Sequence, residues 1–147
     1  MYEDVIDPRN SYGYSIPDFT QAIAINPDIA EYYDERGKAY TAERDYTRGI
    51  ADMCQAIALK PDYTDAYRDR AKTYGYIFDY ASAVTDYTSV IELEPGSASN
   101  YYDRAMAYAG SQDYASERQD LEKALTLSKD SELTKKIADS IAAVQGK

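Results

Sequence analysis

Residues 33–40 read YDERGKAY, and the pattern returns as YRDRAKTY at residues 67–74 and as YYDRAMAY at residues 101–108. The interval is 34 residues each time, and a tyrosine begins and ends every copy. The same interval separates two further columns, Tyr46, Tyr80 and Tyr114, and Pro27, Pro61 and Pro95. A fixed period of this length is typical of stacked supersecondary units, each of which buries its apolar face against the next. The period therefore predicts a binding surface built by repetition, not an active site.

The spacing within each copy is helical. Tyr33, Gly37 and Tyr40 fall on one face of a helix, and the apolar residues of 50–57 follow the same spacing until Pro61 ends it. Two helices of about 13 residues joined by a short polar turn form a helical hairpin. The aspartates in the turns are expected to accept hydrogen bonds from the free N–H groups that open each second helix: Asp45, Asp79 and Asp113.

These residues resemble the tetratricopeptide repeat: a bulky aromatic, a small residue four positions on, an aromatic three later, then alanine, another aromatic and a closing proline. The resemblance covers residues 10–131. It implies an all-α fold, a right-handed α-solenoid of helix-turn-helix hairpins with a C-terminal capping helix. It divides the chain into an N-terminal segment with a half repeat (1–29), three repeats (30–63, 64–97 and 98–131) and a capping helix (132–147).

A second column supports this alignment. Arginine stands at positions 36, 70 and 104, where the general pattern has leucine, and aspartate follows 16 residues later at positions 52, 86 and 120. That spacing places each pair on facing helices of one hairpin. We expect an Arg–Asp ion pair in every repeat, as in the bacterial-type repeats that this pattern resembles. Exposed pairs contribute only ~0–1 kcal/mol, so the pair is expected to set register more than stability.

The ends and one position depart from the pattern. Residues 10–27 fit the second half of a preceding unit whose first helix is missing or replaced by residues 1–9, and such an end invites self-association. Residues 131–145 carry a stripe typical of a cap helix: Leu133, Ile137, Ile141 and Val144. In the third repeat Glu117 replaces the small residues found at positions 49 and 83, so the packing there should be looser, or Glu117 must reach Arg104.

Composition and charge exclude several classes of function. The net charge is −10 and no basic stripe is present, so nucleic acid is a poor partner. Histidine is absent and Cys54 is the single cysteine, so we expect no catalytic triad, metal or cofactor, and no enzyme activity. No apolar stretch is long enough to span a membrane. The acidic start of the chain does not have the features of a signal peptide, which favours the cytoplasm.

The resemblance also selects a ligand surface, because the first helices of such repeats line a concave groove. The predicted groove residues are Asp34, Lys38, Arg68, Lys72, Tyr76, Tyr102 and Met106. The three cations among them would suit an extended segment with a carboxylate and an apolar side chain; the alternative is ordinary solvated helix surface. The carboxylate clamp of some relatives is absent, since Asp34 occupies a lysine place and Asp69 an asparagine place.

Three hypotheses about function follow. The first is a non-catalytic scaffold that binds a peptide or protein segment in the groove. The second is a self-associating module, a homo-oligomer formed through the N-terminal half repeat. The third is a non-catalytic part of a larger enzyme or assembly.

Overall fold

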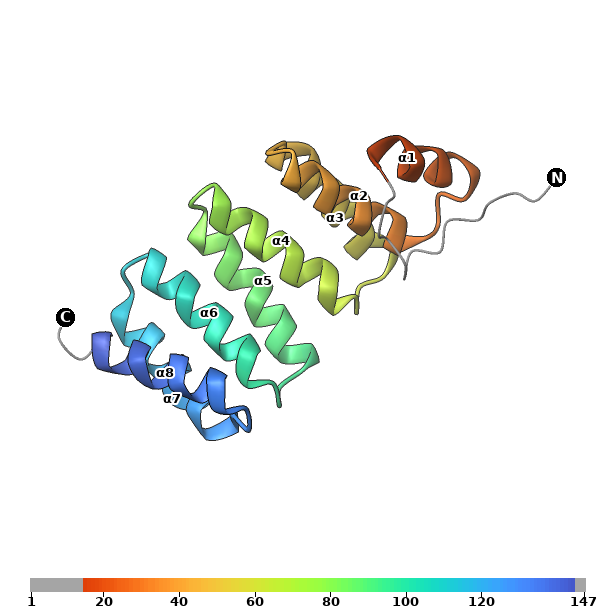
Figure 1. The fold of residues 1–147 in the computed structure, drawn as a ribbon. Coiled ribbons are helices and arrows are strands. Elements are labelled where there is room, and N and C mark those ends of the chain that lie inside the picture. Colours follow the sequence, from red (N-terminus) through yellow and green to blue (C-terminus); the bar gives the residue numbers. More distant parts are fainter. Residues whose placement is uncertain (1–14, 145–147) are drawn as a thin grey trace. The chain divides into compact units, whose positions relative to one another are not determined.

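The structure, a computed structural model, describes residues 15–144, which form eight α-helices and no strand (Figure 1). The helices are α1 (Ile16–Ile25), α2 (Ala30–Ala42), α3 (Tyr46–Leu59), α4 (Thr64–Tyr76), α5 (Tyr80–Leu93), α6 (Ala98–Gly110), α7 (Tyr114–Leu127) and α8 (Ser131–Val144). The all-α class expected from the sequence is confirmed. No helix among these residues is long and apolar enough to cross a membrane.

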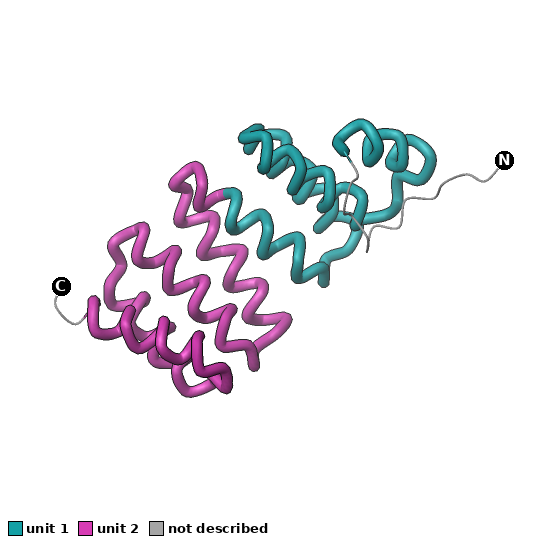
Figure 2. The backbone as a smooth tube through the Cα atoms, viewed as in Figure 1, with its two compact units in different colours: residues 1–73 teal, residues 74–147 magenta. Residues whose placement is uncertain are grey.

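The chain divides into two compact units, residues 1–73 and residues 74–147, with the boundary inside α4 (Figure 2). Unit 1 contains the α2–α3 hairpin, against which α1 packs through α2. Unit 2 contains the α6–α7 hairpin, with α5 packed on α6 and α8 packed on α7. The segment at residues 1–9, where the first helix of the half repeat was expected to be replaced, lies outside the described residues.

The turns between paired helices have one repeated construction. The carboxylates of Asp45, Asp79 and Asp113 each accept a hydrogen bond of 3.1 Å from the backbone N–H three residues later, as predicted. The residue before each aspartate has left-handed backbone, with φ of 64° at Arg44, 62° at Phe78 and 62° at Gln112. None of the three is a glycine, although this conformation disfavours a side chain.

The arginine column makes the expected ion pairs inside both units. Arg36 binds Asp52 through two nitrogens at 2.7 and 2.8 Å, and Arg104 binds Asp120 with the same two distances. Arg70 lies in unit 1 and Asp86 in unit 2, so their pair stays a prediction.

Each arginine also contacts the residue 16 positions before it. Arg36 Nη1 donates a hydrogen bond to Thr20 Oγ1 at 3.2 Å, and Arg104 Nη1 donates one to Thr88 Oγ1 at 3.0 Å. Arg70 Nη1 contacts Cys54 Sγ at 3.1 Å, so the single cysteine takes the place that threonine has in the other copies.

In unit 1 the two helices of the hairpin approach each other closely at Gly37. A Cβ at this position would lie 3.0 Å from the carbonyl oxygen of Gly49 and 3.1 Å from Met53 Cγ, which explains the small residue. Phe19 and Ala22 of α1 are buried with Tyr32, so α1 packs its apolar face against α2.

In unit 2 the apolar stripe of α8 closes the core. Ile137 and Val144 are buried in one cluster with Ala105, Leu121 and Ala124, and Leu133 and Ile141 pack against it. Glu117 is also buried, yet its Oε2 has no hydrogen-bond partner among the described residues. Arg104 is paired with Asp120 and Thr88, and no bond joins it to Glu117 among the contacts of the described chain.

Candidate functional site

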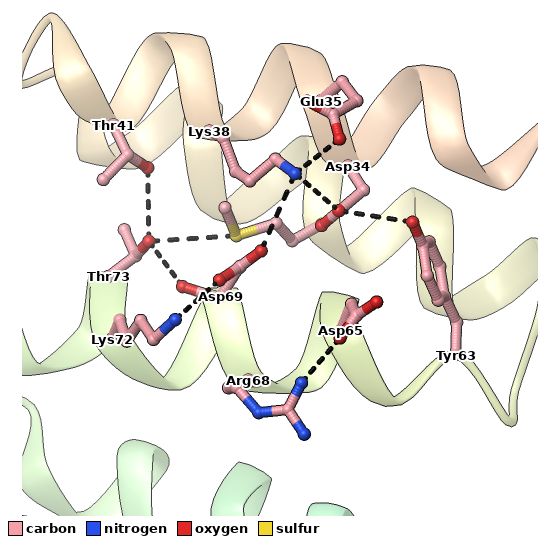
Figure 3. A network of polar contacts seen from close by, with 11 residues as sticks. Asp34, Glu35, Lys38, Thr41, Tyr63, Asp65, Arg68, Asp69, Lys72 and Thr73 are labelled. Atoms are coloured by element: carbon pink, nitrogen blue, oxygen red, sulfur yellow. Dashed lines mark hydrogen bonds and ion pairs between the residues drawn. The ribbon is translucent and has the colours of Figure 1, made fainter. Parts of the chain in front are cut away.

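Polar side chains of α2 and α4 meet on one face of unit 1, together with Tyr63, which precedes α4 (Figure 3). We call six of them the Lys38 network: Asp34, Glu35, Lys38, Tyr63, Asp69 and Lys72. Helical spacing places Asp34 and Lys38 one turn apart on α2, and Asp69 and Lys72 one turn apart on α4. Thr41 of α2 and Thr73 of α4 lie nearby, and their hydroxyl oxygens are 3.2 Å apart.

Lys38 is the centre of this network. Its Nζ lies 2.5 Å from Glu35 Oε1, 3.6 Å from Asp34 Oδ2 and 4.0 Å from Asp69 Oδ2. Burial alone would lower the pKa of Lys38, but the bond to Glu35 and the charges of the two aspartates raise it. Its side chain is 39% exposed, so the network opens to solvent at this point.

Asp34 is the buried member of the network. Its side chain is fully buried, Oδ2 accepts a hydrogen bond of 3.4 Å from the Tyr63 hydroxyl, and Oδ1 has no hydrogen-bond partner among residues 15–144. Burial raises the pKa of Asp34 to about 7; the charge of Lys38 opposes this, and the charges of Asp69 and Glu35 add to it. Burial and the charge of Asp34 in turn raise the pKa of Tyr63.

The cations predicted for the groove are all paired with carboxylates of this chain. Lys72 Nζ lies 3.1 Å from Asp69 Oδ1, and Arg68 Nη1 lies 2.6 Å from Asp65 Oδ1. The acid stands three residues before the cation in each case, as Glu35 does before Lys38. The face therefore lacks the unpaired positive charge that a segment carrying a carboxylate would need.

The three remaining predicted residues belong to unit 2. Tyr76, at the end of α4, is 60% exposed. Tyr102 and Met106 of α6 are partly buried and pack against the cluster around Ile137. The structure thus brings Asp34, Lys38 and Lys72 together around Asp69, with Arg68 on the same helix as Lys72, and uses Tyr102 and Met106 in the packing of α8.

Sequence reasoning did not foresee the roles of Tyr63 and Tyr32. Tyr63 precedes α4 and donates to Asp34, whereas Tyr32 is buried against Phe19. The acid three positions before each cation was a signal for the ion pairs. No comparable signal marked Tyr63, because its partner lies 29 residues away in the sequence.

Unit 2 contains a separate cavity of about 580 Å³ on the α6–α7 hairpin. Its lining includes Tyr101, Arg104, Tyr108 and Asp120, but none of the predicted groove residues. The guanidinium of Arg104 is already held by Asp120 and lies 5.9 Å from the centres of both tyrosine rings. Within this lining the charges of Arg104 and Asp120 therefore neutralise each other, and we place the candidate site at the Lys38 network instead.

Comparison with known proteins identifies the repeat. The model of the tetratricopeptide repeat family matches residues 30–63 and 98–131. The chain contains tetratricopeptide repeats. A comparison with curated protein sequences gave no match.

Solved structures with tetratricopeptide repeats have the same fold. A crystal structure of the MamA protein is 25% identical, with a TM-score of 0.73 over 86% of this chain and 67% of that one. MamA from Desulfovibrio magneticus RS-1 is 18% identical, with a TM-score of 0.73 over 89% of this chain and 82% of that one. The OM64 tetratricopeptide repeat domain of Arabidopsis is 19% identical, with a TM-score of 0.69 over 78% of this chain and 95% of that one.

Tetratricopeptide repeats are units of protein-interaction scaffolds, and stacked repeats present extended binding surfaces. Asp34, Glu35 and Lys38 of the Lys38 network lie on α2, the first helix of the matched repeat 30–63, and Asp69 and Lys72 lie on α4. Self-association through the half repeat stays a prediction.

Proposed function

We propose that the chain is a non-catalytic interaction module whose α2–α4 face, centred on the Lys38 network, binds an extended segment of a partner protein. Asp34, Lys38, Arg68 and Lys72 are the residues proposed to contact it. Tyr76, Tyr102 and Met106 belong to unit 2, and their part in binding stays a prediction.

The buried carboxylate of Asp34 is the observation that carries this proposal. A polar cluster that served packing alone would be more stable with every buried group paired, because an unpaired buried oxygen costs about 1–3 kcal/mol. Asp34 retains such an oxygen, next to side chains that are open to solvent. A cost of this kind at a solvent-accessible cluster is typical of a site that is completed by a ligand.

The first test identifies a ligand without assuming its chemistry. The whole chain would be panned against a displayed library of random dodecapeptides, and the enriched peptides synthesised. A photo-crosslinking amino acid would then replace Lys72, whose side chain is 50% exposed on the proposed face. We expect these peptides to crosslink efficiently at position 72.

The matched control places the same label at position 48. Arg48 is 63% exposed on α3 and is also paired with an acid three residues before it, Asp45. Weak crosslinking at position 48 is expected. Equal crosslinking at the two positions, or a library that yields no enriched peptide, would contradict the proposal.

A further inference from the structure

With its carboxylates ionised, the Lys38 network contains more negative than positive charge. The carboxylates of Asp34, Glu35 and Asp69 all lie within 4.0 Å of Lys38 Nζ, and Lys72 neutralises part of Asp69 from the other side. Three carboxylates thus face two ammonium groups. This excess favours a positively charged ligand group and repels a carboxylate.

The geometry of Lys38 leaves the network incompletely satisfied. Its ammonium group makes one short bond, to Glu35, while the distances of 3.6 and 4.0 Å to Asp34 and Asp69 are too long for hydrogen bonds. Asp34 Oδ1 is buried with no hydrogen-bond partner within the described part of the chain. Asp34 Oδ1 therefore lacks a donor in the described chain, and the second oxygen of Asp69 lies beyond hydrogen-bond distance of the Lys38 ammonium group.

We infer that this network receives an arginine side chain of the segment bound under the proposed function, on which this inference rests. A guanidinium carries five N–H donors in a rigid planar fork, so one arginine can bond to carboxylates on two helices, whereas an ammonium group acts as a point charge. The arginine enters where Lys38 now lies, and the flexible, partly exposed Lys38 side chain moves outward to admit it.

The ionisation of Asp34 gives this inference a distinctive signature. Burial raises the pKa of Asp34 to about 7, so at neutral pH the carboxyl is partly protonated in the unbound chain. The charged groups that face it are Lys38 and Glu35 of α2 and Asp69 of α4, with the Tyr63 hydroxyl completing its surroundings. An arriving guanidinium favours the ionised form, so binding releases a proton.

A divalent metal is a weaker candidate for the same position. The described residues contain no group of three or more carboxylate, histidine or cysteine side chains arranged to hold a metal ion. An organic cation on a peptide needs no such coordination sphere.

The experiment uses the peptides enriched by the library described above. We expect arginine to be over-represented among them, and its replacement by glutamine in the peptide to weaken binding at least ten-fold. Asp34→Asn and Asp69→Asn should each weaken binding of the arginine peptide by a similar factor, with little effect on the glutamine peptide. Asp139→Asn, the same charge change on α8, should leave binding unchanged.

Proton release is the second readout. Calorimetric titration at pH 7 in two buffers of different ionisation enthalpy should detect it with the wild type and not with Asp34→Asn. If Asp34→Asn does not fold, as judged by circular dichroism, the loss of affinity in Asp69→Asn, whose side chain lies nearer the surface, tests the inference instead.

Two outcomes would overturn the inference, and they differ in what else they affect. Enriched peptides that crosslink at position 72 but show no arginine preference, or bind Asp34→Asn and Asp69→Asn unchanged, would overturn the arginine assignment and leave the proposed function standing. Failure to enrich any peptide, or equal crosslinking at positions 48 and 72, would overturn both.

Discussion

The α2–α3 and α6–α7 hairpins make the same contacts where they hold a repeat together, but differ at neighbouring positions. Arg36–Asp52 and Arg104–Asp120 have the same bond distances, and Asp45 and Asp113 cap their helices in the same way. Two periods separate Asp34 from Tyr102, and these residues have different roles. Asp34 is a buried carboxylate beside an open face, whereas Tyr102 packs against the core under α8.

The difference extends to the contact between paired helices. Gly37 and Gly49 bring α2 and α3 close together, while Ala105 and Glu117 stand at the equivalent places of α6 and α7. The hydrogen-bonded frame of the repeat therefore tolerates large changes one or two residues away. Measurements on four sets of variants test this contrast between the two hairpins.

The largest effect is expected for Gly37→Leu. Even a Cβ at this position would lie 3.0 Å from the Gly49 carbonyl oxygen, so a leucine must force the helices apart. We expect a loss of about 3 kcal/mol in the free energy of unfolding, measured by urea denaturation. Lys72→Leu, an exposed control on α4, should change it little. A loss below about 1 kcal/mol for Gly37→Leu would show that close approach is not required in this hairpin.

The second prediction tests whether the Arg–Asp ion pairs contribute equally to the stability of the two hairpins. Asp52→Asn and Asp120→Asn each leave a largely buried guanidinium without its charged partner. We expect losses of about 2 kcal/mol in each case, similar within about 0.5 kcal/mol. The control Glu122→Gln breaks the exposed pair with Arg118 and should cost well under about 1 kcal/mol. Clearly unequal losses would mean that the two pairs do not have the same role.

The third prediction concerns the buried carboxylate of Asp34, whose place in α6 is taken by Tyr102. The pKa of Asp34 is raised from 3.8 to about 7 in the folded chain. Between these values the folded state retains a proton that the unfolded state has lost. The contribution of Asp34 to stability is therefore full below about pH 4 and is lost as the pH rises through about 7.

Asp34→Asn cannot titrate, so it removes this dependence. Between pH 4 and pH 8 the stability of the variant relative to the wild type should rise by a few kcal/mol, because each unit of pKa difference corresponds to about 1.4 kcal/mol. Urea denaturation at pH 4, 6 and 8 measures the difference, which isolates Asp34 from the other acids. Parallel pH profiles for the two chains would contradict the prediction.

The smallest effect is expected for Glu117→Ala, which makes α7 resemble α5 at this position. The change removes a buried carboxylate oxygen that has no hydrogen-bond partner in the described residues. We expect a gain of about 1 kcal/mol in the free energy of unfolding. Glu122→Ala, at an exposed position on the same helix, supplies the control and should have little effect. A loss of stability on Glu117→Ala would mean that Glu117 makes a favourable contact.

The sequence was sufficient for features that recur at every period. Helix ends, the capping aspartates and the Arg36–Asp52 and Arg104–Asp120 pairs each follow from a residue type at a fixed position, so the repeats confirm one another. The surroundings of Lys38 recur only in part: Lys72 and Asp69 stand one period after Lys38 and Glu35, but Met106 stands two periods after Lys38. The contacts of Lys38 depend on which of several nearby carboxylates its long side chain reaches, and the 34-residue register does not determine this.

Each turn places a side chain in left-handed backbone at Arg44, Phe78 or Gln112. Such a residue costs roughly 1 kcal/mol relative to glycine, so glycine at any of the three positions should stabilise the folded chain. Phe78 is also 77% exposed, which adds an apolar surface at a loop tip. For protein engineers who extend this array, glycine at the loop tips should raise the melting temperature without altering the helix faces, and thermal denaturation of Phe78→Gly would measure the gain.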